Sequence, residues 1–172
     1  MEITLQPFVE IPRGILIELK TRLHEAFGCP IDIKDPIPVP EEAFDPRRKQ
    51  YLSDVFLAKL KAMSKSAGKL LGITEVNLFT SGLNFVFGQA DGEAGVAVIS
   101  LHLLRQEEYG LPADEQLLKE RALKEAVHEL GHTFGLGHCP DGSCVMHFSN
   151  SLIDTDCKKT YFCSRCQPKL IL

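Results

Sequence analysis

The chain has 172 residues, of which 44% are apolar and 24% are charged, and its formal net charge is −4. This composition predicts one globular domain with a sizeable core, and it argues against nucleic acid as a partner because phosphate binding needs clustered Lys and Arg. No apolar run approaches the ~20 residues of a membrane span, and the first residues lack the basic start and apolar core of a signal peptide. We therefore expect a cytoplasmic monomer that binds neither nucleic acid nor membranes.

The first part of the chain is expected to alternate short strands and helices. Residues 3–8 fit a strand, a helix with apolar residues at helical spacing follows over 14–27 and ends at Gly28, and residues 31–34 fit a second strand. The segment 35–44 has prolines at alternating positions, which predicts an extended loop.

A second helix is predicted over residues 48–66, where apolar side chains form one face, and Gly68 and Gly72 are expected to end it. Three strand-like segments separated by turn residues follow, at 73–79, 84–90 and 95–101. A β-α-β-α-β order followed by a hairpin predicts an α/β (α+β) fold, a mixed twisted sheet with one antiparallel edge strand.

A long helix is predicted after Asp114, which is the expected N-cap. Apolar residues recur on the face that would pack against the sheet, namely Leu118, Ala122, Ala126 and Leu130. His128 and His132 are four residues apart on an adjacent face. Both imidazoles can therefore reach one metal ion.

Three histidines and a glutamate form the strongest chemical pattern in the chain. Gly135 allows a sharp turn after the helix, and this turn brings His138 back as a third nitrogen ligand beside His128 and His132. Three neutral histidines leave a zinc ion one open position, which is typical of a catalytic site. Glu129 lies beside the first ligand, where its carboxylate can reach a metal-bound water without ligating the metal.

The spacing His-Glu-x-x-His-x-x-Gly-x-x-His, followed closely by Met146, resembles the metzincin zinc peptidases. The cysteine directly after the third histidine, and the segments 44–51 and 82–88, are similar to one metzincin branch, the archaemetzincins. The resemblance implies a metzincin-like zincin fold with Met146 in an apolar Met-turn under the histidines. It also implies that an edge strand, for which 84–90 is the candidate, lines the cleft and pairs with an extended substrate. The alternative is an ordinary strand without a substrate role.

The pattern and the resemblance together predict a zinc-dependent metallopeptidase that acts on peptides or small proteins. Zinc lowers the pKa of its bound water from 15.7 to about 7, and Glu129 would act as the general base when this water attacks a peptide carbonyl. The alternative is a non-hydrolytic peptide-binding or adaptor protein that has kept a metallated cleft. The intact Glu129 and third histidine favour the enzyme.

Four cysteines predict a second zinc site. They form two short-spaced pairs that lie about twenty residues apart, a spacing typical of a tetrahedral zinc site: Cys139, Cys144, Cys163 and Cys166. Four thiolates leave no open position, so this zinc would be structural. Two disulfides or a redox-active pair are weaker interpretations for a cytosolic chain.

We therefore expect two zinc ions per chain and a single metzincin-like catalytic domain over residues 1–172. Its N-terminal lobe would span about 1–137 and a small irregular zinc-knuckle lobe about 138–172. The apolar pattern of the second lobe is weak, and a bound metal would supply the folding free energy that this lobe lacks.

Three further residues have no firm assignment from the sequence. Cys29 and Cys157 fit neither cysteine pair and are expected to be buried or free thiols, although Cys157 lies close enough in the chain to substitute as a ligand. His147 follows the methionine of the Met-turn, and it is either a contact in the cleft or an ordinary surface histidine.

Overall fold

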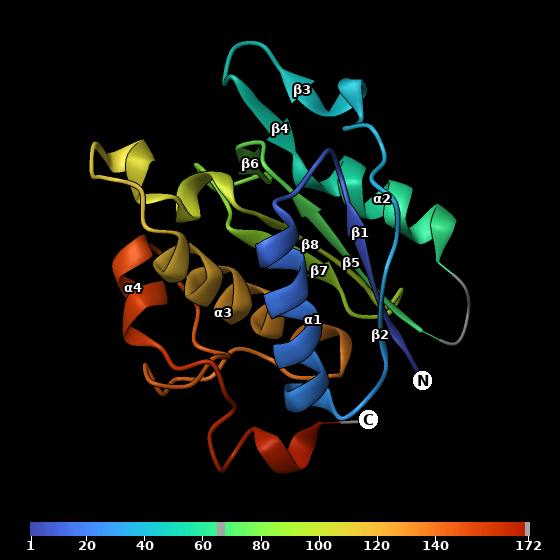
Figure 1. The fold of residues 1–172 in the computed structure, drawn as a ribbon, viewed down its shortest axis with the longest axis vertical. Helices are drawn as coiled ribbons and strands as arrows, with labels where there is room; N and C mark the ends of the chain where they lie inside the picture. Colours follow the sequence, from blue (N-terminus) through green and yellow to red (C-terminus); the bar gives the residue numbers. More distant parts are fainter. Residues whose placement is uncertain (65–67, 171–172) are drawn as a thin grey trace.

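The computed structural model describes residues 1–64 and 68–170, which form a mixed α/β fold around a five-stranded sheet (Figure 1). Four strands run parallel, and the fifth is antiparallel at one edge. In their hydrogen-bonding order the strands are β2 (Ile31–Ile33), β1 (Ile3–Pro7), β5 (Lys69–Thr74), β8 (Val96–Ser100) and β7 (Gly88–Asp91). The predicted mixed sheet with one antiparallel edge strand is confirmed.

Helices cover both faces of this sheet. Helices α1 (Arg13–Phe27) and α3 (Glu115–Thr133) share one apolar core with Leu71 of β5. Helix α2 (Ser53–Met63) packs on the opposite face, where it shares a second core with Leu70. Adjacent residues of a strand point to opposite faces, so strands covered on both sides, such as β8 (Val-Ala-Val-Ile-Ser), are buried along their whole length.

The first three elements agree with the sequence prediction. Helix α1 ends at Gly28, which adopts a left-handed φ of 65° and donates its N–H to the carbonyl of His24 at 2.8 Å. After β2 the chain runs through its prolines without regular structure, as predicted, until a short 3-10 turn at Glu41–Ala43.

The second helix begins later than predicted, because the residues before Ser53 pair as strands. Strands β3 (Phe44–Asp45) and β4 (Gln50–Leu52) form an antiparallel hairpin, and β4 pairs in parallel with β6 (Leu78–Phe79). This small sheet projects beyond the end of the main sheet (Figure 1). The apolar residues of β4 fit a strand as well as a helix, so their spacing alone did not place the boundary.

The prediction that Gly72 ends the second helix is wrong, since Gly72 lies within β5. A Cβ atom at Gly72 would lie 2.9 Å from Leu60 Cδ1 and from Phe8 Cε2. Glycine therefore allows α2 to pack closely on the sheet. Helix α2 ends at Met63, and part of the predicted helical stretch falls on residues 65–67, which lie outside the described residues.

Two of the three predicted strands have different bounds. The strand predicted over 73–79 divides between β5, which already begins at Lys69, and β6, which belongs to the small sheet. Only the end of the strand predicted over 84–90 lies in β7. Its first half connects to the small sheet through one bridge between Val86 and Leu78. The last predicted strand is confirmed as β8.

Between α3 and residue 170 the chain is irregular except for α4 (Leu152–Cys157) and a 3-10 turn at Gln167–Lys169. Two further 3-10 turns, His102–Leu104 and Gln106–Tyr109, connect β8 to α3. Within the described residues, no helix has the length and apolar character needed to cross a membrane. The division into two lobes stays a prediction.

Candidate active site and metal centres

Helix α3 carries the first two histidines of the motif into the protein interior. It begins as predicted, with Asp114 Oδ1 accepting a hydrogen bond from Leu117 N at 2.9 Å. It ends at Thr133, and the chain then turns at Gly135, whose φ is 88°. Glycine adopts this left-handed conformation without steric cost, and the turn returns His138 to the helix.

The three histidines of the motif converge as predicted. Each offers one ring nitrogen, and these atoms lie within 4.8 Å of one another. The Nε2 atoms of His128 and His132 are 3.2 Å apart. Two nitrogens bound to one tetrahedral zinc ion would lie about 3.3 Å apart, because each Zn–N bond is about 2.0–2.1 Å long. The spacing therefore fits zinc, and His138 is exposed and lines the cleft.

Backbone carbonyls fix the orientation of two rings. The Nδ1 atom of His128 lies 2.7 Å from the carbonyl of Val145, and Nδ1 of His132 lies 2.8 Å from that of Leu136. A carbonyl only accepts, so each Nδ1 carries the hydrogen and each Nε2 keeps a free lone pair. Burial lowers the pKa of all three imidazoles, including that of His138, which favours the neutral form that binds metal.

Glu129 is buried beside the histidines and lines the same cleft. Burial raises the pKa of this carboxyl well above its ordinary value, nearby Glu125 raises it further, and the cation of Lys158 opposes both effects. Lys158 is fully buried, and its Nζ lies 3.0 Å from Glu125 Oε1, which also accepts a hydrogen bond from Thr155 at 3.0 Å. A satisfied buried ion pair therefore lies behind the carboxylate of the motif.

Two neighbouring hollows lie beside the histidines and share several lining residues, among them His128 and Glu129. The larger has a volume of about 720 Å³ and runs past the three histidines, between β7 and the turn at Gly135. The smaller has a volume of about 180 Å³ and lies beside Glu129, between residues 83–88 and 148–150. Both include Phe148, whose ring centroid is 5.0 Å from that of His138. The cleft therefore follows the three histidines and has a side pocket next to the carboxylate.

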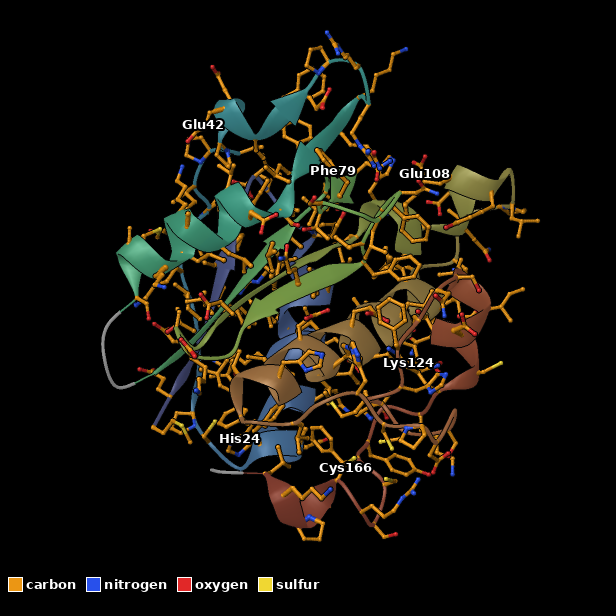
Figure 2. All side chains as sticks on the ribbon, turned by 180° about the vertical axis from the view of Figure 1, so that it is seen from behind. His24, Glu42, Phe79, Glu108, Lys124 and Cys166 are labelled. Atoms are coloured by element: carbon orange, nitrogen blue, oxygen red, sulfur yellow. The ribbon has the colours of Figure 1, made fainter. Side chains whose placement is uncertain are left out.

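The four predicted cysteines form a second cluster. One of its members, Cys166, is labelled in Figure 2. Their Sγ atoms lie within 4.8 Å of one another, and those of Cys139 and Cys163 are 3.8 Å apart. Two thiolates on one tetrahedral zinc ion would also lie about 3.8 Å apart, given a Zn–S bond of about 2.3 Å. Backbone N–H groups, that of Arg165 foremost, lower the pKa of the Cys163 thiol to about 6, whereas burial raises that of Cys166.

Met146, the methionine expected in a Met-turn, packs against helix α3, and its Met-turn role stays a prediction. It is fully buried, and a Cβ atom at Gly131 would lie 2.5 Å from its Sδ. The thioether therefore packs against the helical turn between the two histidines of α3. The carbonyl of Met146 accepts a hydrogen bond from Cys139 N at 2.9 Å, which connects this position to the residue after the third histidine.

The remaining candidates belong to neither cluster of ligand atoms. The thiol of Cys29 is buried, and that of Cys157 is exposed at the end of α4, apart from the four clustered cysteines. His147 is half-buried, its Nδ1 lies 3.0 Å from the carbonyl of Cys139, and it is not among the residues that line the described cleft.

Sequence reasoning did not single out Glu125, Lys158 or Gly88. Gly88 lies against Glu129, Glu125 lines the smaller hollow, and Lys158 pairs with Glu125. The position of Glu125, one helical turn before Glu129, was a usable signal. Lys158 is distant in sequence, and nothing in its local pattern indicates burial.

Relatives and solved structures agree with this architecture. The chain is 48% identical to archaemetzincin of Pyrococcus furiosus, over 98% of this chain and 91% of the relative. It is similar to a solved zinc-dependent peptidase of Methanocorpusculum labreanum, with a TM-score of 0.90, 32% identity, and coverage of 97% of this chain and 98% of the other. A solved archaemetzincin of Methanopyrus kandleri gives a TM-score of 0.87 at 41% identity, covering 98% and 92%.

The fold and the histidine cluster, taken with these relatives, define the class of the protein as a zinc-dependent metallopeptidase. The model of peptidase family M54 matches residues 10–171. The chain belongs to this family, so the resemblance to archaemetzincins is confirmed.

Proposed function

We propose that the chain hydrolyses peptide bonds at a zinc ion held by His128, His132 and His138, with Glu129 as the general base. The observation that carries this proposal is the convergence of three ring nitrogens beside a buried carboxylate on the wall of an open cleft. Three neutral nitrogen ligands leave zinc one open position, as in catalytic sites. The carbonyl bonds to two of the rings support the assignment, because they direct Nε2 toward a shared point.

A zinc ion at this position would supply Lewis acidity, lowering the pKa of water in its open position to about 7 and polarising the peptide carbonyl. Glu129 accepts the proton that the water loses as it attacks, and then delivers this proton to the nitrogen of the leaving amine. Positioned proton transfer of this kind is typically worth ~10²–10⁴ in rate. The burial of Glu129 supports the role, since its raised pKa increases its affinity for the proton.

The proposed substrate is a peptide in extended conformation along β7. This strand is the edge of the main sheet and pairs with β8 on one side. Unpaired backbone groups at an edge can hydrogen-bond an added strand. Gly88 of β7 lies against Glu129 and lines both hollows, which supports a substrate path past the carboxylate.

The four cysteines are proposed to hold a second, structural zinc ion, which gives two per chain. Their spacing and thiolate chemistry fit a closed tetrahedral site. We propose that this metal stabilises a C-terminal lobe over about 138–172 within one catalytic domain, since regular structure is sparse there. The resulting description is a metzincin-like zincin with a zinc-stabilised lobe.

The family and the buried Glu129 favour the enzyme over a non-hydrolytic peptide-binding protein. We further propose that it works as a monomer in the cytoplasm. Six free cysteines suit a reducing compartment, and the net charge of −4 disfavours nucleic acid as a partner.

The proposal is tested by incubating the zinc-loaded protein with a peptide digest of denatured casein and reading new termini by mass spectrometry. Glu129→Ala is run in parallel, with zinc content measured in both proteins. We expect cleavage by the parent and a loss of about 10²–10⁴ in the variant at equal zinc content. Equal cleavage by both proteins would exclude Glu129 as the base, and no cleavage by the zinc-loaded parent would favour the binding protein.

A further inference from the structure

We propose that Arg48 is a positioning residue for substrate binding. It acts by holding residues 82–87, here named the rim, in place beside the cleft. The inference rests on the proposed function, because the rim acquires a substrate only through the cleft that it borders. The rim lines both hollows: Leu83 and Val86 contribute to each, and Phe85 and Phe87 to the smaller one. The shape of the rim therefore sets the shape of the wall opposite the histidines.

Arg48 contacts the rim directly from the β3–β4 hairpin. Its Nη2 donates hydrogen bonds to the carbonyls of Leu83 at 2.9 Å and Asn84 at 3.1 Å. Its guanidinium lies 4.2 Å from the centroid of the Phe79 ring, which Figure 2 labels on the small sheet. A charged donor makes a stronger hydrogen bond than a neutral one, and the planar group both stacks and donates.

Gln50 reinforces this contact from the next strand. Its Nε2 donates to the carbonyl of Asn84 at 2.9 Å and to Asn77 Oδ1 at 3.1 Å, while its Oε1 accepts from Arg48 Nε at 3.1 Å. The two side chains therefore hold adjacent carbonyls of the rim as one hydrogen-bonded unit.

The hairpin itself is a firm base for these side chains. Asp45 Oδ1 accepts from Arg47 N at 2.8 Å and from Arg48 N at 3.2 Å, and the carbonyl of Asp45 accepts from Lys49 N at 2.8 Å. Lys49 adopts a left-handed φ of 55°, which closes the turn. The position of Arg48 is thus fixed by its own backbone before it reaches the rim.

The rim is anchored at its far end, where Phe87 is buried and its carbonyl accepts a hydrogen bond from Ser100 N at 2.8 Å. Its first half has less support: the backbone bonds there include Leu83 N to Thr80 O at 3.2 Å and Val86 N to Leu78 O at 2.9 Å, and Leu83 and Asn84 are exposed. A segment with few internal bonds opens easily, so side-chain donors from a neighbouring element decide its order. The two segments that resemble archaemetzincins, 44–51 and 82–88, are therefore in contact and act on one wall of the cleft.

The first experiment follows amide hydrogen exchange in the zinc-loaded protein and needs no substrate. We expect Arg48→Ala to raise exchange across the rim by about tenfold, the size expected for losing one hydrogen bond from a charged donor, while α3 is unchanged. Arg48 is exposed, so we expect the variant to fold. Arg47→Ala removes the neighbouring exposed arginine and serves as the matched control. Equal rim exchange in the two variants would overturn the proposal.

The second experiment measures cleavage of one peptide from the casein digest. We expect Arg48→Ala to raise KM about tenfold while kcat stays within about twofold, because binding is lost equally in the ground state and the transition state. Arg48→Lys keeps the charge without the planar fork, so it should show most of the loss. If Arg48→Lys had the kinetics of the parent, the positive charge alone would account for substrate binding. That result would overturn the proposal that the guanidinium positions the rim. A parent without Glu129-dependent cleavage would instead refute the proposed function, while the exchange experiment still decides the role of Arg48.

Discussion

Gly88 on the edge strand lies directly against Glu129 on α3. A Cβ atom at Gly88 would be 2.6 Å from Cγ and 2.8 Å from Oε1 of that glutamate, and 2.8 Å from the carbonyl oxygen of Val98 on the paired strand. Gly88 does not have a left-handed φ, so the requirement for glycine is one of space alone. The Glu129 side chain therefore packs directly against the backbone of β7, with no room for a Cβ atom between them.

Gly88→Ala is expected to displace the Glu129 carboxylate without removing the histidine cluster. A misplacement of about 1 Å in a catalytic group can cost about 10²-fold in rate, so we expect a loss of that order in kcat with unchanged zinc content. Gly142→Ala is the control, because a Cβ there meets nothing within 4 Å. Parent-like turnover of Gly88→Ala would show that the carboxylate can relocate freely.

The two proposed metal sites predict separable losses of zinc. Metal analysis should give two zinc ions in the parent and one in His132→Ala, which removes a ligand from the open site and abolishes cleavage. Cys166→Ser should also retain one zinc ion, but with a lower melting temperature, because the second metal supplies folding free energy. A parent with one zinc ion, or a Cys166→Ser variant with the parent's zinc content, would contradict the four-cysteine site.

The buried pair of Lys158 and Glu125 predicts an asymmetric effect on stability. Lys158→Met leaves a buried carboxylate without its cation and should lower the free energy of unfolding by about 3–5 kcal/mol. Glu125→Leu combined with Lys158→Met removes both charges and should recover much of this loss. Urea unfolding at constant zinc concentration measures both variants. Equal destabilisation in the single and double variants would mean that packing, and not the unpaired charge, sets the cost.

The metal ligands could be predicted because their geometry is set by local spacing. His128 and His132 share a face of any helix, and Gly135 permits the turn that returns His138. The cysteine cluster followed from two short loops in the same way. By contrast, Gly88 reaches Glu129, and Lys158 reaches Glu125, from other parts of the chain, and no local pattern reports such contacts.

The fold was predicted correctly where the spacing of apolar residues fits either a helix or a strand but not both, as in α1, α3 and β8. It was mispredicted over the β3–β4 hairpin, where Tyr51 and Leu52 fit both a helix and a strand. The outcome there depends on pairing with Leu78 and Phe79, nearly thirty residues later. Gly72 was mistaken for a helix stop, because its close packing against Leu60 is a tertiary contact. Non-local contacts override local propensity at these positions.

The buried imidazoles predict a pH dependence for the protein whose open site has lost its metal. Burial lowers the pKa of His128 well below 6.5, so the unfolded chain takes up this proton first as pH falls. The stability from this group is therefore present above pH 6.5 and is lost as pH falls below it, by about 1.4 kcal/mol per pH unit. Glu129 has the opposite sign, because its raised pKa makes the folded state bind the proton more tightly.

The measurement therefore uses Glu129→Gln, which removes the opposing group. A chelator concentration that removes one zinc ion per chain, checked by metal analysis, empties the open site before the closed one. We expect the free energy of unfolding to fall more steeply between pH 6.5 and 5 in Glu129→Gln than in Glu129→Gln combined with His128→Gln, by about 1.4 kcal/mol per pH unit. Parallel pH profiles in the two proteins would show that His128 takes up a proton as readily in the folded state as in the unfolded state. Burial would then not favour the neutral imidazole that the metal requires.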